Sequence, residues 1–264
     1  MATTRTLAER HVIVTGGSRG IGLAIAAELA ARGAVITLVA RDASRLRDAG
    51  ASLGTKHAAI AADITVEADA ERAMDAAAKQ AGTPWALVNN AGSAEAASFL
   101  AGDSALWRRM LDVNLMAAVY CSRRVLPAMR AAGGGRIVNI ASLAGLAGFR
   151  YVSAYVASKH ALVGMTRALA MEVARDGVAV NAVCPGYTAT PMLEESIASA
   201  SARTGKSADE IRAVYAASNP GGRLIQPGEV ARAVAWLCEP AQGALSGEAI
   251  TVDDERIPQR RRSP

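Results

Sequence analysis

The chain has 264 residues, of which 51% are hydrophobic and 4% aromatic, and its formal net charge is +5. This length allows one α/β domain with a large core, and we expect residues 1–264 to form a single domain. A nucleic-acid-binding protein would show a dense basic stripe with interleaved aromatic residues, whereas the one arginine run here, residues 260–262, falls in a segment, residues 256–264, that we expect to be a disordered tail.

Apolar runs alternate with helical patterns along the chain. We expect strands at residues 11–16, 34–41, 57–64, 85–92, 136–142, 178–186 and 247–254, and helices at residues 23–33, 66–82, 104–135, 153–177 and 227–240. Continuously apolar strands that are each followed by a helix are typical of a parallel sheet covered on both faces. The sequence therefore predicts a doubly wound parallel α/β sheet of about seven strands, with helices on both faces.

Residues 188–219 interrupt this alternation between the sixth strand and the next helix. The segment is polar and rich in small residues. Insertions of this kind often form a mobile lid over a ligand. We expect a substrate lid here, with an inert surface excursion as the alternative.

Several other kinds of site find no support in the sequence. Three cysteines and three histidines are scattered without metal-ligand spacing, so we expect no metal. The N-terminal residues lack the apolar core of an export signal, and no apolar run approaches the roughly 20 residues of a membrane span. We expect a cytoplasmic protein with neither membrane nor nucleic-acid partners.

The turn after the first strand reads VTGGSRGIG and places glycines at positions 16, 20 and 22. Absent side chains let backbone N–H groups approach a pyrophosphate, and the N-terminus of the following helix attracts the same anion. The spacing G-x-x-x-G-x-G differs from the common dinucleotide fingerprint G-x-G-x-x-G. The motif therefore indicates a dinucleotide site, while a plain strand-to-helix turn stays open as the alternative.

The end of the second strand bears on which dinucleotide binds. An NAD-binding unit usually carries a carboxylate there for the ribose 2′-OH, whereas this chain has Ala40 followed by Arg41. A guanidinium can bind the 2′-phosphate that a carboxylate would repel, and Arg19 in the glycine loop could reach the same group. These residues favour NADP(H) over NAD(H). If Arg41 instead faces solvent or pairs with Asp42, NAD(H) could serve.

A tyrosine, a lysine and a serine form the candidate catalytic set. Tyr155 and Lys159 are four residues apart and share one face of a predicted helix, and Ser142 closes the fifth strand. A phenol is a poor acid–base group at neutral pH, but a nearby ammonium stabilises the phenolate and lowers the phenol pKa. A lone Tyr-x-x-x-Lys pair is common by chance; its place after the serine strand and the glycine loop favours catalysis.

Together these motifs resemble the classical short-chain dehydrogenase/reductase family, in particular its 3-oxoacyl-carrier-protein reductase branch. The matching pieces follow the order of the family along nearly the whole chain: TGGSRGIG, NNAG at residues 89–92, Asn114 in DVNLMA, Ser142, YVASK at residues 155–159, and PGYTATPM from Pro185. The resemblance implies a Rossmann-type domain that transfers hydride to or from a nicotinamide cofactor.

The resemblance also implies catalytic roles. Tyr155 would donate a proton in ketone reduction and accept it in alcohol oxidation. Lys159 would hold the nicotinamide ribose and tune Tyr155. Ser142 would hydrogen-bond the substrate carbonyl, and Asn114 would kink its helix and hold a water in a proton relay with Lys159. His160 is expected to face the opposite side of the helix and pack there.

Two sets of residues are expected to surround the ligands. The cofactor set is Gly16, Ser18, Arg19, Gly20, Ile21, Gly22, Arg41, Asp63, Ile64, Asn90, Ala91, Gly92, Tyr155, Lys159, Pro185, Gly186 and Thr188, with Asp63 at the adenine and residues 185–190 over the nicotinamide. The substrate set is Ser142, Leu143, Ala144, Phe149, Tyr151, Tyr187, Met192 and Leu193.

One departure concerns the C-terminal strand, where Asp254 and Glu255 stand in place of the Gly-Gly that often follows Asp in the family. That region commonly packs at a subunit interface, and the resemblance implies a homotetramer or homodimer formed through the long helices that carry Asn114 and Tyr155.

The leading functional hypothesis is NADP(H)-dependent reduction of a ketone, with a 3-oxoacyl thioester carried on CoA or an acyl carrier as the favoured substrate. The scaffold serves many substrates, so other enzymes stay open. One alternative is an NAD(H)-dependent alcohol, 3-hydroxyacyl-CoA, sugar or steroid dehydrogenase. Another is a catalytically silent nucleotide-binding sensor or scaffold.

Overall fold

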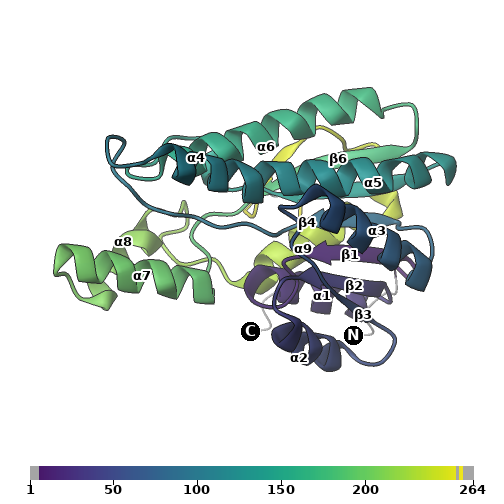
Figure 1. Ribbon diagram of the computed structural model, residues 1–264, viewed down its shortest axis with the longest axis horizontal. Helices are drawn as coiled ribbons and strands as arrows, with labels where there is room; N and C mark the ends of the chain where they lie inside the picture. The colour runs from purple at the N-terminus through teal and green to yellow at the C-terminus, as the bar shows by residue number, and fades with distance from the viewer. Residues whose placement is uncertain (1–5, 254–255, 258–264) are drawn as a thin grey trace.

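A seven-stranded, wholly parallel sheet forms the centre of the molecule (Figure 1). The computed structural model describes residues 6–253, 256 and 257. The strands follow the order β3-β2-β1-β4-β5-β6-β7, and their bounds are β1 His11–Thr15, β2 Val35–Ala40, β3 Ala58–Ala61, β4 Ala86–Asn89, β5 Gly135–Ile140, β6 Val178–Cys184 and β7 Ala249–Thr251. The predicted Rossmann-type doubly wound sheet is confirmed.

Helices cover both faces of the sheet. Their bounds are α1 Gly20–Ala31, α2 Ala43–Leu53, α3 Glu67–Ala81, α4 Ser104–Leu111, α5 Ala117–Ala131, α6 Ser153–Glu172, α7 Pro191–Thr204, α8 Ala208–Ala217 and α9 Pro227–Cys238. Helices α1 and α9 pack together on one face, and α3 and α5 pack together on the other, where α6 also lies (Figure 1).

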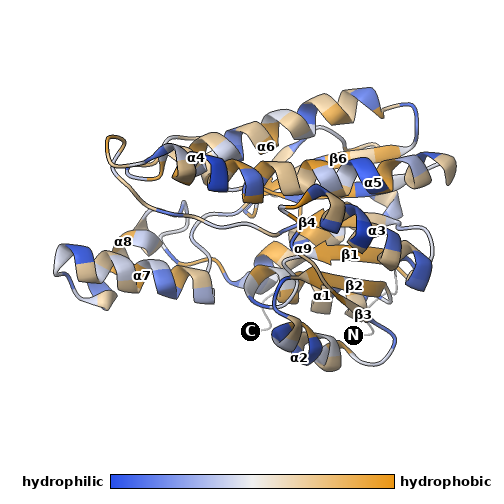
Figure 2. Ribbon diagram, in the orientation of Figure 1, coloured by the Kyte–Doolittle hydropathy of each residue, from blue (hydrophilic) through white to orange (hydrophobic). Residues whose placement is uncertain are grey.

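The alternation of side chains along each strand explains why two cores form. In β1, Val12 and Val14 point into the core with α1 and α9, while Ile13 points into the core with α3 and α5. Both faces are buried, so the strands are apolar at most positions, and Figure 2 shows them largely in orange. Each fully buried large apolar side chain contributes about 1.5–3 kcal/mol, which makes this register hard to shift.

Two helical regions differ from the sequence prediction. The expected helix at residues 104–135 is three consecutive parts, because a π-helical segment, Asp112–Met116, separates α4 from α5. Helix α2 is absent from the predicted elements. Only Leu46 and Ala49 of α2 are buried, so few apolar positions mark it in the sequence. The Asp42 carboxylate, which accepts hydrogen bonds from Ser44 N and Arg45 N, marks its start.

The predicted lid segment, residues 188–219, contains helices α7 and α8, which project beside the rest of the molecule (Figure 1). They bury a small apolar cluster of their own, made of Leu193, Ile197, Ala200 and Ile211. Thr190 caps α7 and Ser207 forms a capping box with α8. Small and polar residues between these few apolar positions hid the helical pattern in the sequence.

The C-terminal strand is shorter than expected, since β7 has only three residues. The departure at Asp254 and Glu255 lies outside the described residues, as do residues 258–264 of the predicted tail. None of the described helices combines the length and apolar character that a bilayer crossing requires. Among the same residues, no group of three His, Cys, Asp or Glu side chains is placed to hold a metal.

Candidate active site

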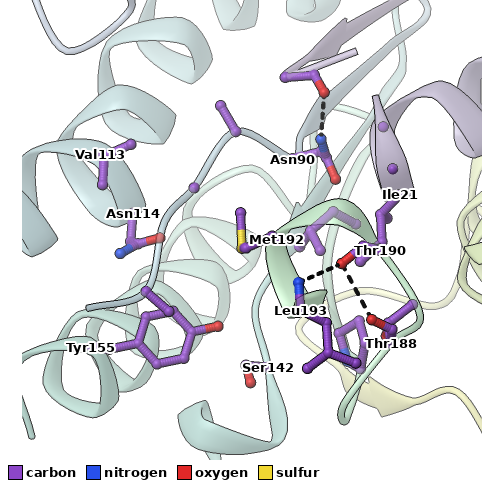
Figure 3. Close-up of a pocket in the computed structure, with 18 of the residues that line it drawn as sticks. Ile21, Asn90, Val113, Asn114, Ser142, Tyr155, Thr188, Thr190, Met192 and Leu193 are labelled. Atoms are coloured by element: carbon purple, nitrogen blue, oxygen red, sulfur yellow. Dashed lines mark hydrogen bonds between the residues drawn. The ribbon is translucent and has the colours of Figure 1, made fainter. Parts of the chain in front are cut away.

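A cavity of about 480 Å³ runs along the carboxyl ends of the strands (Figure 3). It crosses the point between β1 and β4 where the strand order reverses, which is where open parallel sheets bind their ligands. Of the residues expected around the cofactor and substrate, all but Tyr151 line this one cavity.

The glycine loop after β1 leaves bare backbone at the cavity wall. Gly16 and Gly20 have φ values of 64° and 56°, which side chains rarely adopt. A Cβ atom at Gly22 would lie 2.3 Å from Gly16 O and one at Gly16 would lie 2.8 Å from Ala91 Cα, so larger residues do not fit. Helix α1 begins at Gly20, so its free N–H groups face the same space. This cradle fits a pyrophosphate.

Asn90 and Thr15 hold the glycine loop against the end of β4. Asn90 Nδ2 donates hydrogen bonds to Thr15 O at 2.9 Å and Gly16 O at 3.1 Å. Thr15 Oγ1 accepts from Asn90 N at 3.0 Å and Ala91 N at 3.2 Å. Sequence analysis did not identify Thr15 as a residue of this site. A hydroxyl residue at the carboxyl end of a buried strand is the signal that could have found it.

The β2 and β3 ends form one half of the cavity. Asp42 Oδ2 pairs with Arg45 Nε at 3.2 Å, and the hydrogen bond from Arg45 N, followed by the Arg45 charge, lowers the Asp42 pKa. Asp63 Oδ1 accepts from Thr65 Oγ1 at 2.7 Å. Arg41 lines the cavity and forms no ion pair within the part of the chain that the structure describes. Asp42 therefore pairs with Arg45 and leaves Arg41 available to a ligand.

Arg19 takes a different direction from the one expected. Its Nη1 atom pairs with Glu195 Oε1 of α7 at 2.8 Å. The guanidinium thus joins the glycine loop to the lid segment instead of joining Arg41 at the end of β2. The acidic partner on α7 lies 176 residues away, which sequence spacing could not indicate.

Ser142 and Tyr155 bring two hydroxyl groups to the same part of the cavity, as Figure 3 shows. Ser142 follows β5 and caps a 3₁₀ turn, Leu143–Gly145, by accepting from Ala144 N at 3.1 Å. Tyr155 lies in the first turn of α6. Lys159 lies one turn later, is buried, and donates from Nζ to Ile140 O at 2.8 Å.

Burial controls the charge state of this group. Burial raises the pKa of Tyr155 above its ordinary value, and the hydrogen bond with Ser142 opposes this rise only in part. Burial also lowers the pKa of Lys159 to about 8. Lys159 Nζ donates to Ile140 O, and burial has the largest effect on the Tyr155 pKa; a lowering of that pKa by Lys159 stays a prediction. Tyr155 is therefore a neutral phenol that can donate a proton.

Asn114 lies in the π-helical segment between α4 and α5 and is buried. Its Oδ1 atom accepts from Ser93 N at 3.2 Å and its Nδ2 atom donates to Ser93 O at 2.9 Å. A Cβ atom at Gly92 would lie 2.7 Å from Asn114 Oδ1 and 3.5 Å from Lys159 Nζ. The glycine therefore keeps a passage open between Asn114 and Lys159, and the helix departs from α-geometry where the resemblance implied a kink.

Aromatic rings form the wall on the lid side of the cavity. Tyr187 and Tyr215 stack with centroids 4.4 Å apart, and Phe149 meets Tyr187 edge-on at 6.5 Å. Tyr215 was missed, because nothing in the sequence aligns it with Tyr187. The remaining expected residues that line the cavity are Ser18, Ile21, Ile64, Leu143, Ala144, Pro185, Gly186, Thr188, Met192 and Leu193.

Two expected positions are corrected by the structure. Tyr151 lies outside the cavity: its side chain is 62% exposed, its φ is 66°, and its carbonyl accepts from Ala97 N. The preceding loop turns the ring to solvent. His160 faces away from the cavity as expected but is exposed rather than packed, with Nδ1 3.0 Å from Val156 O.

Asn219 is a further residue that sequence reasoning missed. Its Oδ1 atom accepts from Tyr187 N at 2.8 Å, and its Nδ2 atom donates to Tyr187 O and Arg223 O. A Cβ atom at Gly186 would lie 2.1 Å from Asn219 Oδ1. Asn219 therefore fixes the loop that follows β6, at the end of the lid segment.

A model of the short chain dehydrogenase family matches residues 10–218. The chain belongs to this family. A cis-4-hydroxycyclohexanecarboxylate dehydrogenase of Sinomonas cyclohexanicum is 39% identical over 93% of this chain and 96% of its own. A granaticin polyketide synthase putative ketoacyl reductase of Streptomyces violaceoruber is 37% identical over 95% of this chain and 94% of its own.

Solved structures of this family are closely similar. A single-residue variant of the actinorhodin polyketide ketoreductase, whose crystal structure was determined with NADPH, has a TM-score of 0.89 and 36% identity, over 96% of this chain and 97% of that one. Ketoacyl reductases thus stand among the relatives, in keeping with the resemblance to the 3-oxoacyl reductase branch. The protein is an oxidoreductase that acts on CH–OH groups with NAD(P), a cofactor that the glycine cradle fits.

The state of Tyr155 predicts opposite pH dependences for the two directions of reaction. Ketone reduction needs the phenol, which its raised pKa preserves at neutral pH; alcohol oxidation needs the phenolate. We expect kcat/KM for oxidation to rise steadily from about pH 7 to about pH 10, and kcat/KM for reduction to stay level and then fall at alkaline pH, where Lys159 also loses its charge. Steady-state rates in both directions measure this. An oxidation rate that peaks at or below neutral pH would contradict the assigned proton state.

Proposed function

We propose that the protein is an NADP(H)-dependent reductase that converts a ketone, specifically a 3-oxoacyl thioester on CoA or an acyl carrier, to a secondary alcohol. The observation that carries this proposal is the convergence of the Ser142 and Tyr155 hydroxyls in the cavity that also holds the glycine cradle. A nucleotide sensor without catalysis would not need a buried lysine beside two converging hydroxyls, so the enzyme is favoured.

The chain's own residues handle the proton and the carbonyl oxygen. The nicotinamide cofactor, when bound, supplies or accepts the hydride. Ser142 donates a hydrogen bond to the carbonyl oxygen, and Tyr155 donates its proton to the same oxygen as negative charge develops there. Lys159, next to Gly92 and Asn114, contacts the nicotinamide ribose and helps to return a proton to Tyr155.

The cofactor is held by groups on both sides of the β1–β4 switch point. The glycine loop and the N-terminus of α1 take the pyrophosphate, and Asn90 keeps that loop in place. Arg41, free of an ion pair among the described residues, binds the 2′-phosphate of NADP(H). Asp42 does not oppose this phosphate strongly, because its carboxylate caps α2 and pairs with Arg45.

A second substrate class, cyclic ketones and alcohols, is supported by the stacked rings of Tyr187 and Tyr215. A flat aromatic wall suits a ring as well as an acyl chain. The relative from Sinomonas cyclohexanicum is named for a cyclic alcohol. A panel of ketones and alcohols that includes acetoacetyl-CoA and cyclohexanone, assayed with NADPH and NADH, separates the two classes. A homotetramer or homodimer and a cytoplasmic location stay predictions.

Replacing Tyr155 by phenylalanine tests the chemistry. The Tyr155→Phe variant loses only the hydroxyl, so we expect kcat to fall by about 10²–10⁴-fold while NADPH affinity changes little. Steady-state kinetics and fluorescence titration of NADPH measure the two effects. Tyr151→Phe is the matched control, because Tyr151 lies outside the cavity. A Tyr155→Phe enzyme with near-normal kcat would refute the assignment.

Replacing Arg41 tests the cofactor. A charge-assisted contact with phosphate is worth roughly 1.5–3 kcal/mol, reduced at an exposed site, so NADPH should be preferred over NADH by about tenfold or more in kcat/KM. Arg41→Ala should remove most of this preference, and Ala40→Asp combined with Arg41→Ala should reverse it. Arg47→Ala, which removes a charge from α2 outside the cavity, is the control. A wild-type preference for NADH would refute the proposal.

A further inference from the structure

Helix α7 lays one row of side chains along the outer part of the cavity. Met192, Ser196, Ser199 and Arg203 recur at intervals of three or four residues, and all four line the cavity. Side chains with this spacing share one face of a helix. The row starts beside Leu193 and Thr190 near the catalytic hydroxyls, as Figure 3 shows for Met192, and leads to Arg203 in the last turn of α7.

Arg203 brings an uncompensated positive charge to this part of the cavity. It forms no ion pair with any described residue. Every acidic side chain of residues 188–219 is engaged elsewhere, by Arg19, by Arg212 or in the Ser207 capping box; these acids are Glu194, Glu195, Asp209 and Glu210. Nothing in the lid segment therefore neutralises Arg203.

The acids that line the cavity lie in its other half. Among the described residues these are Asp42 and Asp63, at the ends of β2 and β3, and both are already hydrogen-bonded by neighbouring groups. The lid half of the cavity combines an aromatic wall with the serines Ser196, Ser199 and Ser218 and the guanidinium of Arg203. Such a guanidinium attracts a carboxylate or a phosphate.

The position of Arg203 also limits the shape of the ligand. Arg203 follows Met192 by eleven residues, so their Cα atoms lie about 16 Å apart along α7. A molecule that touches both the catalytic hydroxyls and Arg203 must be extended, with its anionic group at the end remote from the reacting carbonyl.

We propose that Arg203 binds a phosphate or carboxylate at the far end of an extended oxo substrate. Ser199 hydrogen-bonds the chain between the two ends, and Ser196, whose hydroxyl donates to Met192 O, accepts a hydrogen bond from it. This subsite rests on the proposed function, because it supplies the specificity of that reaction. The phosphate of a phosphopantetheine arm and the terminal carboxylate of a long-chain oxo acid both meet the requirement.

Binding to the NADPH-loaded protein, measured by calorimetry, tests the subsite without relying on turnover. Two ligand pairs differ only in the anion: 4′-phosphopantetheine with pantetheine, and 8-oxononanoate with its methyl ester. We expect the wild type to bind the charged member of at least one pair about tenfold more tightly, as a charge-assisted contact provides. The pair that shows the preference identifies the source of the anion.

Variants assign the effect to Arg203. Arg203→Gln should abolish the preference and Arg203→Lys should retain part of it, while affinity for the neutral members stays unchanged. Lys206→Gln, which removes a nearby charge that does not line the cavity, should keep the preference. Equal binding of charged and neutral members by the wild type, binding of neither, or a preference that survives in Arg203→Gln would each overturn the proposal. Absence of ketone turnover in the wild type would instead contradict the proposed function alone.

Discussion

The close approach of the glycine loop to the end of β4 is the constraint on which the site depends. One amide, Asn90 Nδ2, donates to two successive carbonyls of the loop, and one hydroxyl, Thr15 Oγ1, accepts from two N–H groups after β4. These bonds close the turn only because Gly16 and Gly22 leave room for it. The same contact sets the N-terminus of α1 over the sheet edge, between the part of the cavity at the ends of β2 and β3 and the part at the ends of β4, β5 and β6.

The catalytic side of the cavity depends on burial. Ser142, Tyr155 and Lys159 come from two elements, the end of β5 and the start of α6, and the buried carbonyl of Ile140 anchors the lysine between them. Desolvation keeps the phenol protonated and makes the lysine easier to discharge. Before any ligand binds, Tyr155 is therefore already in the protonated form that ketone reduction needs.

Sequence patterns predicted the parts of this site that follow from strand ends. Continuous apolar runs located the strands, the glycine and serine motifs directly after them fell at one sheet edge, and the start of the helix with Tyr155 met the same edge. Other parts depend on contacts between distant segments: Asn219 under Gly186, Tyr215 against Tyr187, and Glu195 on Arg19. No local periodicity encodes them, and the raised Tyr155 pKa likewise depends on the depth of the folded site. Helix α2, which is mostly exposed, shows that a well-capped helix with few buried apolar residues can escape sequence analysis.

The central claim is that this cavity directs hydride to a carbonyl carbon while Tyr155 protonates its oxygen. The most direct measurement is reduction of a ketone by NADPH that carries deuterium in place of the transferred hydride, with the product examined by NMR. The account predicts one deuterium on the carbinol carbon and a hydroxyl proton that exchanges with solvent. An alcohol without deuterium on that carbon, formed from fully deuterated cofactor, would contradict it.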